Sequence, residues 1–572
     1  MNSKNYNKVV VIGLDGATYD LLAKWTAEGK LPNLKKIIDE GSFGLLKSVP
    51  NLNSAAAWSS FITGLNPGKH GIFFFHEHID HSFKLKFLNA THRQGREIWE
   101  ILSDAGKKVG VINVPMTYPS KQVNGFMVAG LDTPSPDSEG FTYPSDLYQH
   151  IIKHIGAYTI ESDMGRKIRK GDLGGGIRVG LETIKNRTRA TKFLLNNYQW
   201  DFFMVVFRAI DNVQHHYWRY LDPLYPLYEP KLALKYGNAI LQIYEGIDEA
   251  IGEILDSIPN DTNIVVMSDH GSAPAEFGPH FFNHFLEKTG YLNLAVKENA
   301  GIGLTVKHQF KMWIENFIDL ADIHAGGRVR QFLKANFFKS LSNLSAMKYY
   351  PDINWQKSLA YSPVARPEIW INLKGREPFG IVSEKDYDKV CDEIIVRLYE
   401  WRDPTTNKKV IKKAVKRSEA YSGPYVNKSA DIIIQLYDHL ITGIELPTKY
   451  VVKEVKQMFN PIKDYKGFIF GKHADNGIII TSGPAFKTGS VINGAYIVDI
   501  MPTILYLFGL ELPYNLDGKI LQDIIRGDFV SQNPVKIAGD GTGINLSSPE
   551  SWYTSTEMEI IRKRLTDLGY VE

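Results

Sequence analysis

Short apolar runs alternate with helix-like segments through the first 270 residues, and this alternation limits the possible folds more than any other feature of the sequence. Val9–Leu14, 201–210 and Asn263–Ser268 are apolar runs of strand length, and Leu241–Ile258 has the apolar spacing of a helix. Parallel strands that are buried on both faces have this near-continuous apolar character, and helices connect them. The pattern therefore predicts an α/β fold with a mostly parallel sheet and helices on both faces.

The pattern changes between residues 275 and 464, which we interpret as an inserted cap region that partly returns to the core sheet. The same strand and helix signals resume afterwards, so residues 1–274 and 465–530 are expected to form one catalytic core. Residues 531–572 are expected to be a surface tail with one helix. Within the cap, helices are predicted at Lys307–Phe338 and Asp386–Trp401, and strands at Ser358–Asn372 and Ala430–Leu436.

Charge and composition exclude several classes of function. The formal net charge is only +3 over 572 residues, so we expect no nucleic-acid polymer as a partner. No apolar run approaches the ~20 residues of a membrane helix, so no membrane partner is expected. The single cysteine, Cys391, cannot form an internal disulfide, and the polar first residues lack a signal peptide. We therefore expect a cytoplasmic protein, with its oligomeric state left open.

Three of the predicted strands are followed directly by an acidic residue. These residues are Asp15, Asp211 and Asp269. Ligands of open α/β sheets bind at the carboxyl ends of the strands, so the three side chains are expected to meet at one site. Because like charges repel and burial adds to the cost, such a cluster points to a bound metal ion.

Histidines accompany these acidic residues. Asp211 and His215 are four residues apart, so a helix that begins near Asp211 would place both on one face. His270 stands at a predicted strand end and His473 precedes a predicted strand, whereas His216 would point elsewhere on its helix. Oxygen and imidazole ligands without a thiolate suit zinc, manganese or iron.

Further histidines leave alternatives open. His76, His78 and His81 surround Glu77 and could form a third metal site or line the substrate entrance, although an exposed polar loop is the favoured interpretation. His280 and His284 follow the Asp269 motif, and either could contact a substrate. Two other signals are rejected: 64–70 has the wrong spacing for a P-loop, and the alanines after Ser54 do not match a sulfatase motif.

Taken together, the motifs resemble those of the alkaline phosphatase superfamily, in its type I phosphodiesterase/nucleotide pyrophosphatase branch. The likeness is greatest to a prokaryotic group described as predicted phosphohydrolases or phosphomutases, and it covers most of the chain. The segment WINLKGREP at 370–378 also resembles that group. The motifs are VIGLDGA at 11–17, NSAAAWSSFITGLNPGKHG at 53–71, DNVQH at 211–215, SDHG at 268–271, GKH at 471–473 and DIMPTIL at 499–505.

The resemblance implies an alkaline-phosphatase-like three-layer α/β/α sandwich that holds two divalent metal ions, with Zn²⁺ the first choice and Mn²⁺ an alternative. It also implies a nucleophile nine residues before the Thr of a Thr-Gly pair, which here is Ser54. One ion would be bound by Asp15, Ser54, Asp269 and His270, and the other by Asp211, His215 and His473.

The residues after Ser54 depart from those of related nucleotide pyrophosphatases. Ala55, Ala56 and Ala57 stand where those enzymes carry an Asn that binds a phosphoryl oxygen. The candidates for substrate contact are therefore the main chain of Ala55, the side chain of Arg208 and the side chain of His280.

The expected function is metal-dependent hydrolysis of a phosphodiester or phosphomonoester through a phosphoserine-type intermediate on Ser54. The substrate would be a small phosphorylated molecule, nucleotide-like or of another kind. Two alternatives remain: a phosphomutase or phosphotransferase that uses the same nucleophile, and a catalytically silent metal-binding protein.

Overall fold

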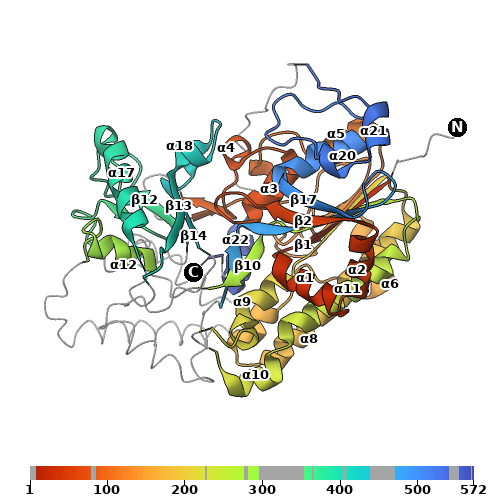
Figure 1. Cartoon of the computed structure of the whole chain (residues 1–572), viewed down its shortest axis with the longest axis horizontal. Helices are drawn as coiled ribbons and strands as arrows, with labels where there is room; N and C mark the ends of the chain where they lie inside the picture. The colour runs from red at the N-terminus through yellow and green to blue at the C-terminus, as the bar shows by residue number, and fades with distance from the viewer. Residues whose placement is uncertain are drawn as a thin grey trace.

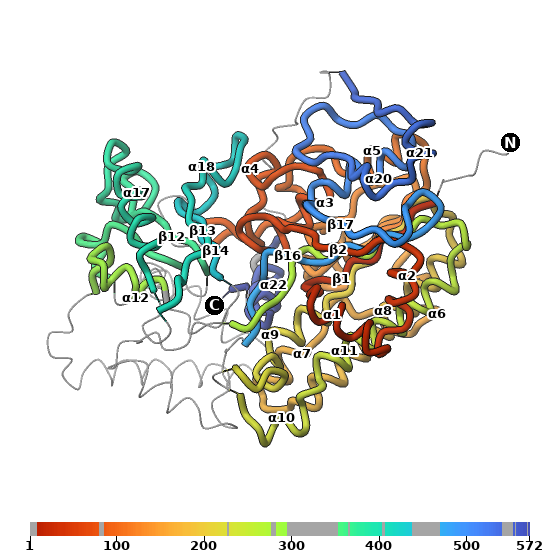
Figure 2. The backbone as a smooth tube through the Cα atoms, in the orientation of Figure 1, coloured from red at the N-terminus to blue at the C-terminus, as the bar shows by residue number. Residues whose placement is uncertain are grey.

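A computed structural model describes most of the chain (Figures 1 and 2). It contains a large α/β core and a smaller unit beside it, which lies on the left in Figure 1. No described helix is long and apolar enough to span a membrane. The described residues are 8–78, 85–225, 228–275, 281–294, 353–363, 366–402, 407–437, 470–539, 553–568 and 570–571.

A nine-stranded sheet forms the centre of the core. Strand β1 (Val9–Leu14) lies between β8 (Phe202–Phe207) and β9 (Asn263–Met267) and is parallel to both. Only β16 and β7 run against the others, so the predicted mostly parallel sheet is confirmed. The strand order is β17 (Ser490–Tyr496), β2 (Gly41–Lys47), β16 (Asn476–Ser482), β9, β1, β8, β5 (Val109–Ile112), β6 (Gly125–Val128) and β7 (Thr142–Tyr143).

Helices cover both faces of this sheet, as the α/β/α sandwich requires. Along β1, Val10 and Ile12 belong to one hydrophobic cluster, whereas Val9 and Val11 belong to a second cluster on the opposite face. The first cluster includes residues of α1 (Tyr19–Ala27), α2 (Pro32–Asp39), α6 (Leu147–Ile155), α7 (Met164–Arg169), α8 (Leu173–Asn197), α9 (Ala209–Leu221), α11 (Ala239–Leu255) and α22 (Ser555–Asp567). The second includes residues of α3 (Ser54–Thr63), α5 (Ile98–Asp104), α20 (Ile500–Leu507) and α21 (Gly527–Gln532). The predicted three-layer fold is therefore confirmed.

The smaller unit is built from the segment between β10 (Gly271–Pro274) and β15 (Gly471–Ala474), which pair with each other as antiparallel strands. It has its own hydrophobic cluster, and its long helix α17 (Glu384–Glu400) lies near the predicted Asp386–Trp401. Its four-stranded sheet has the order β11 (Ala360–Tyr361), β12 (Glu368–Ile371), β14 (Ile432–Leu436) and β13 (Ile411–Lys416).

One expectation about this unit, which we call the cap, is not met. None of its described strands joins the nine-stranded sheet, so the expected partial return to the core sheet does not occur in the described part of the cap. The reason is that β12 and β14 are buried between their own neighbours and α17, which gives them a separate core. The predicted helix at Lys307–Phe338 lies outside the described residues.

The expectation of a surface tail at the end of the chain is wrong. The predicted helix exists as α22, but Ile561, Leu565 and Leu568 are buried in the first hydrophobic cluster of the core. Arg564 donates hydrogen bonds to the main-chain oxygens of Leu131, Thr133 and Pro134, which fixes the helix to the core. The chain beyond α22 then continues inward, and Tyr570 is buried beside the site described next.

Candidate active site

Three carboxylates meet at the carboxyl end of the central strands. Asp15 directly follows β1, Asp269 comes two residues after β9, and all three carboxylates, including Asp211, are fully buried with 0% exposure. Asp211 does not end a strand as expected, because β8 stops at Phe207 and Asp211 lies in the first turn of α9. That turn places His215 one turn further along the same helix, as the spacing of four residues predicted.

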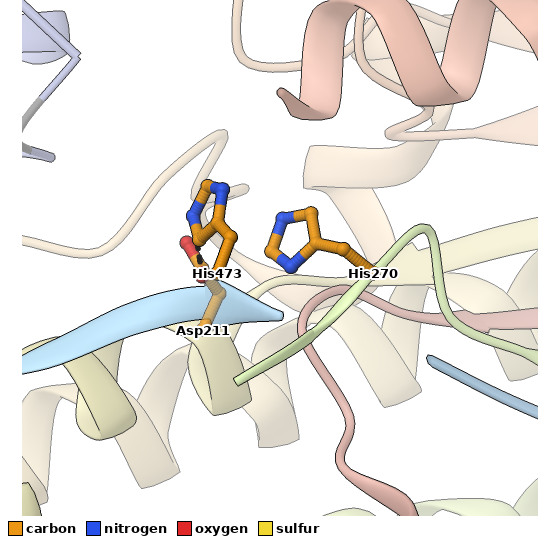
Figure 3. A group of neighbouring side chains, drawn as sticks. All are labelled: Asp211, His270 and His473. Carbon is orange, nitrogen blue, oxygen red and sulfur yellow. Dashed lines mark ion pairs between the residues drawn. The ribbon is translucent and has the colours of Figure 1, made fainter. Parts of the chain in front are cut away.

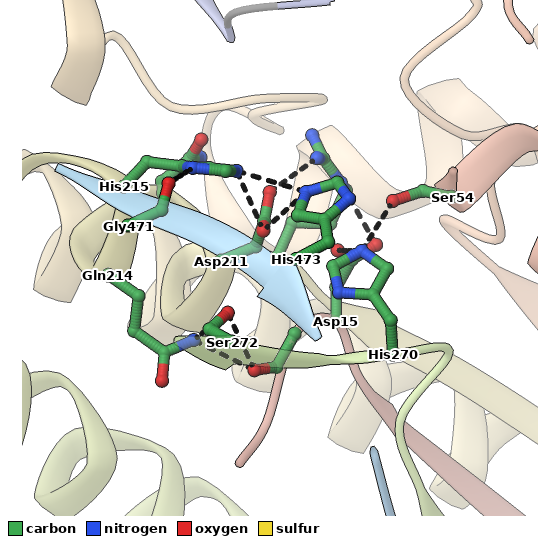
Figure 4. A network of polar contacts seen from close by, with 12 residues as sticks. Asp15, Ser54, Asp211, Gln214, His215, His270, Ser272, Gly471 and His473 are labelled. Carbon is green, nitrogen blue, oxygen red and sulfur yellow. Dashed lines mark hydrogen bonds and ion pairs between the residues drawn. The ribbon is translucent and has the colours of Figure 1, made fainter. Parts of the chain in front are cut away.

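Three histidines are oriented toward these carboxylates by main-chain carbonyl groups (Figure 4). The Nδ1 atoms of His215, His270 and His473 lie 2.7 Å, 2.9 Å and 2.6 Å from the carbonyl oxygens of Gly471, Gly271 and Leu52. A carbonyl oxygen can only accept, so each Nδ1 carries the proton and donates it. When the ring is neutral, the lone pair of Nε2 therefore points into the site, which is the orientation that a metal-binding histidine needs.

The Nε2 atoms converge on the carboxylates. His215 Nε2 lies 3.1 Å from Asp211 Oδ1, His473 Nε2 lies 3.4 Å from the same oxygen, and His270 Nε2 lies 3.3 Å from Asp269 Oδ2. Figure 3 shows the rings of His270 and His473 facing each other beside Asp211. The Nε2 atoms of His215 and His473 are only 3.1 Å apart, so their lone pairs repel unless a proton or a cation lies between them.

Three buried carboxylate oxygens at this point have no hydrogen-bond partner: Asp15 Oδ1, Asp211 Oδ1 and Asp269 Oδ2. Buried carboxylate oxygens without donors are costly, and a divalent cation removes that cost. The residues present therefore fit metal binding. Potential ligand atoms form two groups within 4.8 Å, Asp15 with Asp269 and His270, and Asp211 with His270 and His473. His270 thus borders both groups, although the sequence assigned it to one.

The pKa shifts of the three carboxyl groups indicate that the site as a whole lacks positive charge. Burial raises the pKa of Asp15 to about 6, and burial together with Asp15 and Asp211 raises the pKa of Asp269 well above its usual value. At Asp211 the effect of burial is outweighed by His215 and His473, which hold its pKa well below the usual range. Asp269 therefore lacks the compensation that Asp211 obtains from histidines, and Arg208 and Trp58 offset only part of the effect of burial at Asp15.

Ser54 lies at the start of α3, beside the group formed by Asp15, Asp269 and His270. Its Oγ is 3.1 Å from His270 Nε2 and 2.9 Å from the phenol oxygen of Tyr570. Asn53 caps the helix by accepting a hydrogen bond from Ala55 N at 3.0 Å. The N–H of Ala55, which we expected to face a substrate, is therefore bound within the helix cap.

Arg208 lies within the site and pairs with three carboxylates. Its Nε is 3.2 Å from Asp15 Oδ2, its Nη1 is 2.7 Å from Glu161 Oε2, and its Nη2 is 3.3 Å from Asp211 Oδ2. The same Nη2 donates to the phenol oxygen of Tyr570 at 3.2 Å. Burial and the charge of Asp211 raise the pKa of Tyr570 well above its usual value of 10, so the phenol stays protonated.

Further hydrogen bonds hold the segments around these carboxylates together. Gln214 Nε2 donates to the Gly16 carbonyl at 2.8 Å and to Ser272 Oγ at 2.9 Å, which joins α9 to the loops after β1 and β9 (Figure 4). Trp58, one turn after Ser54, donates from Nε1 to Asp15 Oδ2 at 3.0 Å. Helix α3, which carries Ser54, and the strand that precedes Asp15 are therefore held in a fixed relation.

The remaining candidate residues do not enter this site. His76 Nε2 lies 3.0 Å from Arg366 of the cap, and the ring of His78 packs against Trp370. Neither belongs to a group of potential metal ligands in the described part of the chain, and His216 does not either. His284 lies in α12 (Phe281–Lys288) of the cap, 3.6 Å from Glu287. His280 and His81 lie outside the described residues.

A family model described as type I phosphodiesterase/nucleotide pyrophosphatase matches residues 9–441. The chain belongs to this family. Type I phosphodiesterases and nucleotide pyrophosphatases are hydrolases of phosphoric ester bonds within the alkaline phosphatase superfamily, and the chain is an enzyme of that class. A search of curated protein sequences finds no match to the chain.

Several solved structures resemble this type I phosphodiesterase family member in fold. Phosphonoacetate hydrolase from Sinorhizobium meliloti 1021, in complex with phosphonoformate, is 14% identical with a TM-score of 0.49, over 86% of this chain and 94% of that one. Human ectonucleotide pyrophosphatase/phosphodiesterase 5 is 13% identical with a TM-score of 0.46, and the match covers 91% of this chain and 100% of that one. An inactive murine ectonucleotide pyrophosphatase/phosphodiesterase 5 in complex with AMP is 12% identical with a TM-score of 0.45, also over 91% and 100%.

Three residues of the site were not foreseen from the sequence of this phosphodiesterase family member. Trp58 carries a usable signal, because it follows Ser54 by four residues and so shares a helix face with it. Glu161 and Tyr570 carry no such signal, since neither stands in a motif or near another site residue along the chain.

Proposed function

We propose that this enzyme hydrolyses phosphodiesters with two divalent metal ions and with Ser54 as the nucleophile. The observation that carries the proposal is the common orientation of the three histidines, which direct Nε2 toward three carboxylate oxygens that lack hydrogen bonds. Ser54 Oγ lies beside one of those Nε2 atoms. One ion would be held by Asp15, Ser54, Asp269 and His270, and the other by Asp211, His215 and His473.

The residues of the chain support an attack by Ser54 on phosphorus. When bound, the two ions supply positive charge that lowers the pKa of the serine hydroxyl and offsets the charge of the phosphoryl oxygens. Ser54 is the first residue of α3, so the helix dipole also favours an anion at this position. The Oγ–P bond forms as the bond to the leaving alkoxide breaks, and the proton lost by Ser54 is returned through water to that alkoxide. Water then hydrolyses the phosphoester on Ser54, which restores the hydroxyl and releases a phosphomonoester.

The charge balance favours a diester over a monoester. A phosphodiester carries one negative charge and a phosphomonoester carries up to two. Arg208 is the buried cation of the site, and it already faces Asp15, Glu161 and Asp211. Its charge is therefore largely offset by these carboxylates, which suits the less charged substrate.

Turnover of two chromogenic esters tests this function. We expect the protein, stripped of metal and reloaded with Zn²⁺ or Mn²⁺, to hydrolyse bis-p-nitrophenyl phosphate faster than p-nitrophenyl phosphate. Ser54→Ala should lose at least ~10³-fold in kcat because no nucleophile replaces the hydroxyl. Equal activity of Ser54→Ala would contradict the serine mechanism. Failure to hydrolyse either ester under every metal condition would favour a phosphomutase with a narrow substrate or a metal-binding protein.

A further inference from the structure

The first turn of α3 offers no side chain that could hold a phosphoryl oxygen. The three residues after Ser54 are Ala55, Ala56 and Ala57, and the N–H of Ala55 is already bound by the Asn53 side chain. A phosphoryl group on Ser54 carries non-bridging oxygens that need donors, since charge on them increases in the transition state. A side-chain donor would therefore come from another element of the structure.

Tyr570 places a phenol at that position. Its hydroxyl lies 2.9 Å from Ser54 Oγ, and its ring packs against Phe75 with 4.9 Å between the ring centroids. A group attached to Ser54 Oγ is therefore formed directly beside the phenol.

The phenol can act as a donor toward Ser54. Arg208 can only donate, and its Nη2 lies 3.2 Å from the phenol oxygen, which must accept. The phenolic hydrogen is not used in that bond, and Ser54 Oγ lies 2.9 Å away as an acceptor for it. His270 extends this series of hydrogen bonds. Its Nδ1–H donates to the Gly271 carbonyl, so its Nε2 can accept from the Ser54 hydroxyl.

The main chain around Tyr570 is fixed from two sides. Tyr570 N donates to the Leu565 carbonyl at 2.8 Å, which closes the end of α22. Arg366 of the cap donates to the Tyr570 carbonyl at 3.1 Å. At the other end of this segment, Tyr553 OH donates to the Asp132 carbonyl at 2.8 Å. A donor that is held in this way needs no reorganisation when a substrate arrives, which is the condition for strong stabilisation of developing charge.

We propose that Tyr570 is a substrate-binding residue whose phenol donates a hydrogen bond to a phosphoryl oxygen during transfer to Ser54. The inference rests on the proposed function of the same site and adds the residue that receives the substrate anion. It also explains why the chain returns to the core after α22 instead of ending on the surface.

The test compares Tyr570→Phe with a matched control, Tyr553→Phe. Both variants lose one buried phenol hydroxyl from the same segment, but only the first removes a group beside Ser54. We expect Tyr570→Phe to lose about 10²-fold in kcat/KM for bis-p-nitrophenyl phosphate. Tyr553→Phe should stay within about twofold of the wild type. The Phe ring keeps the contact with Phe75, so a thermal melt should show both variants folded.

A second measurement does not depend on turnover. Orthovanadate mimics the transferring phosphoryl group, and its binding to the metal-loaded protein can be followed by calorimetry. We expect Tyr570→Phe to bind vanadate about tenfold more weakly than the wild type or Tyr553→Phe, because one donor is lost.

The outcomes separate this inference from the proposed function. Unchanged turnover and vanadate affinity in Tyr570→Phe would overturn the role of the phenol, as would increased turnover, which would mean that the phenol obstructs the site. An equal loss in Tyr553→Phe would also overturn it, because anchoring of the segment would then be the cause. A wild type that neither turns over the esters nor binds vanadate would overturn the proposed function itself, and this inference with it.

Discussion

The indole Nε1 of Trp58 lies 3.0 Å from Oδ2 of Asp15 and donates a hydrogen bond to it. This bond joins α3, which carries Ser54, to the end of β1, which carries the first acidic residue of the site. Both side chains are fully buried, so no water can replace the bond if it is removed.

Trp58→Phe should weaken metal binding more than it weakens the fold. Loss of the indole leaves Arg208 as the remaining donor to Asp15 Oδ2, and removal of an outer hydrogen bond of this kind typically costs ~10–100-fold in metal affinity or activity. The measurement is a zinc titration of the metal-free protein. Trp99→Phe is the control, because Trp99 is also fully buried and donates to an acidic residue, Glu97, away from the site. Equal effects of the two substitutions would contradict the prediction.

Metal loading should stabilise the folded protein. The three carboxylates lie close together, and Zn²⁺ at about one hundred times its dissociation constant would add ~2.7 kcal/mol to the free energy of unfolding. The thermal midpoint should therefore rise on loading and fall with a chelator. His473→Ala should reduce this rise, because it removes a ligand of one of the two ions. His150→Ala, an exposed histidine on α6, should retain the full rise; a full rise in His473→Ala would show that His473 is not a metal ligand.

The stability of the metal-free protein should fall as the pH rises from about 4 to about 6. The pKa of Asp15 is raised by burial to about 6, so over this range the folded state holds a proton that the unfolded state has lost. The stability gained from that proton is complete below the usual pKa and is lost as the pH rises through the raised value. Thermal melts between pH 4 and pH 8 should show a smaller decrease in Asp15→Asn. A decrease identical to that of the wild type would assign the effect to other groups.

Asp431 should be the most sensitive polar residue of the cap. Arg376, from the segment 370–378, contacts it with Nη1 at 2.8 Å and Nη2 at 2.6 Å, and Tyr387 and Ile371 N also donate to it. Asp431→Ala would remove the bidentate partner of the guanidinium and leave it only Glu377 as an acidic partner, at a cost of up to ~3–5 kcal/mol, which limited proteolysis of the cap should detect.

The contribution of Asp431 to stability should depend on pH, and a substitution at an exposed ion pair of the cap is its control. Burial by itself would raise the pKa of Asp431, but Arg376 and Arg417 hold it below the usual value. The stability that Asp431 contributes is therefore present above the usual pKa and is lost as the pH falls through the lowered one. Asp388→Ala removes an exposed ion pair with Lys416 and should leave the proteolysis pattern unchanged.

The fold and most of the residues that meet at the candidate site could be predicted because their signals are local. Strand β1 is found at its predicted bounds, since six apolar residues in a row leave few alternatives. Asp211 was placed at a strand end because the apolar run continues through Ala209 and Ile210. Those two residues are buried as part of α9 instead, and a buried helix face and a buried strand look alike over so few residues.

The role of Tyr570 could not be predicted because its contact with Ser54 joins positions that are 516 residues apart. No periodicity or spacing describes such a contact. Burial of α22 was missed for a related reason. The helix is polar on most sides, and only Ile561, Leu565 and Leu568 reach the core, so its composition is that of a surface element.

The antiparallel pairing of β10 with β15 has a consequence for how the protein can diversify. Pro274 and Gly471 are direct partners, so the chain leaves the core and returns to it at the same place. The core strands therefore keep their register whatever the length of the excursion, because the loop is already closed at its base. Caps of different length can therefore be exchanged between relatives without a change in the pairing of the core strands. His473 lies in β15, opposite Ser272 of β10. An exchange that shifts the pairing of β10 with β15 would therefore also displace a residue of the site.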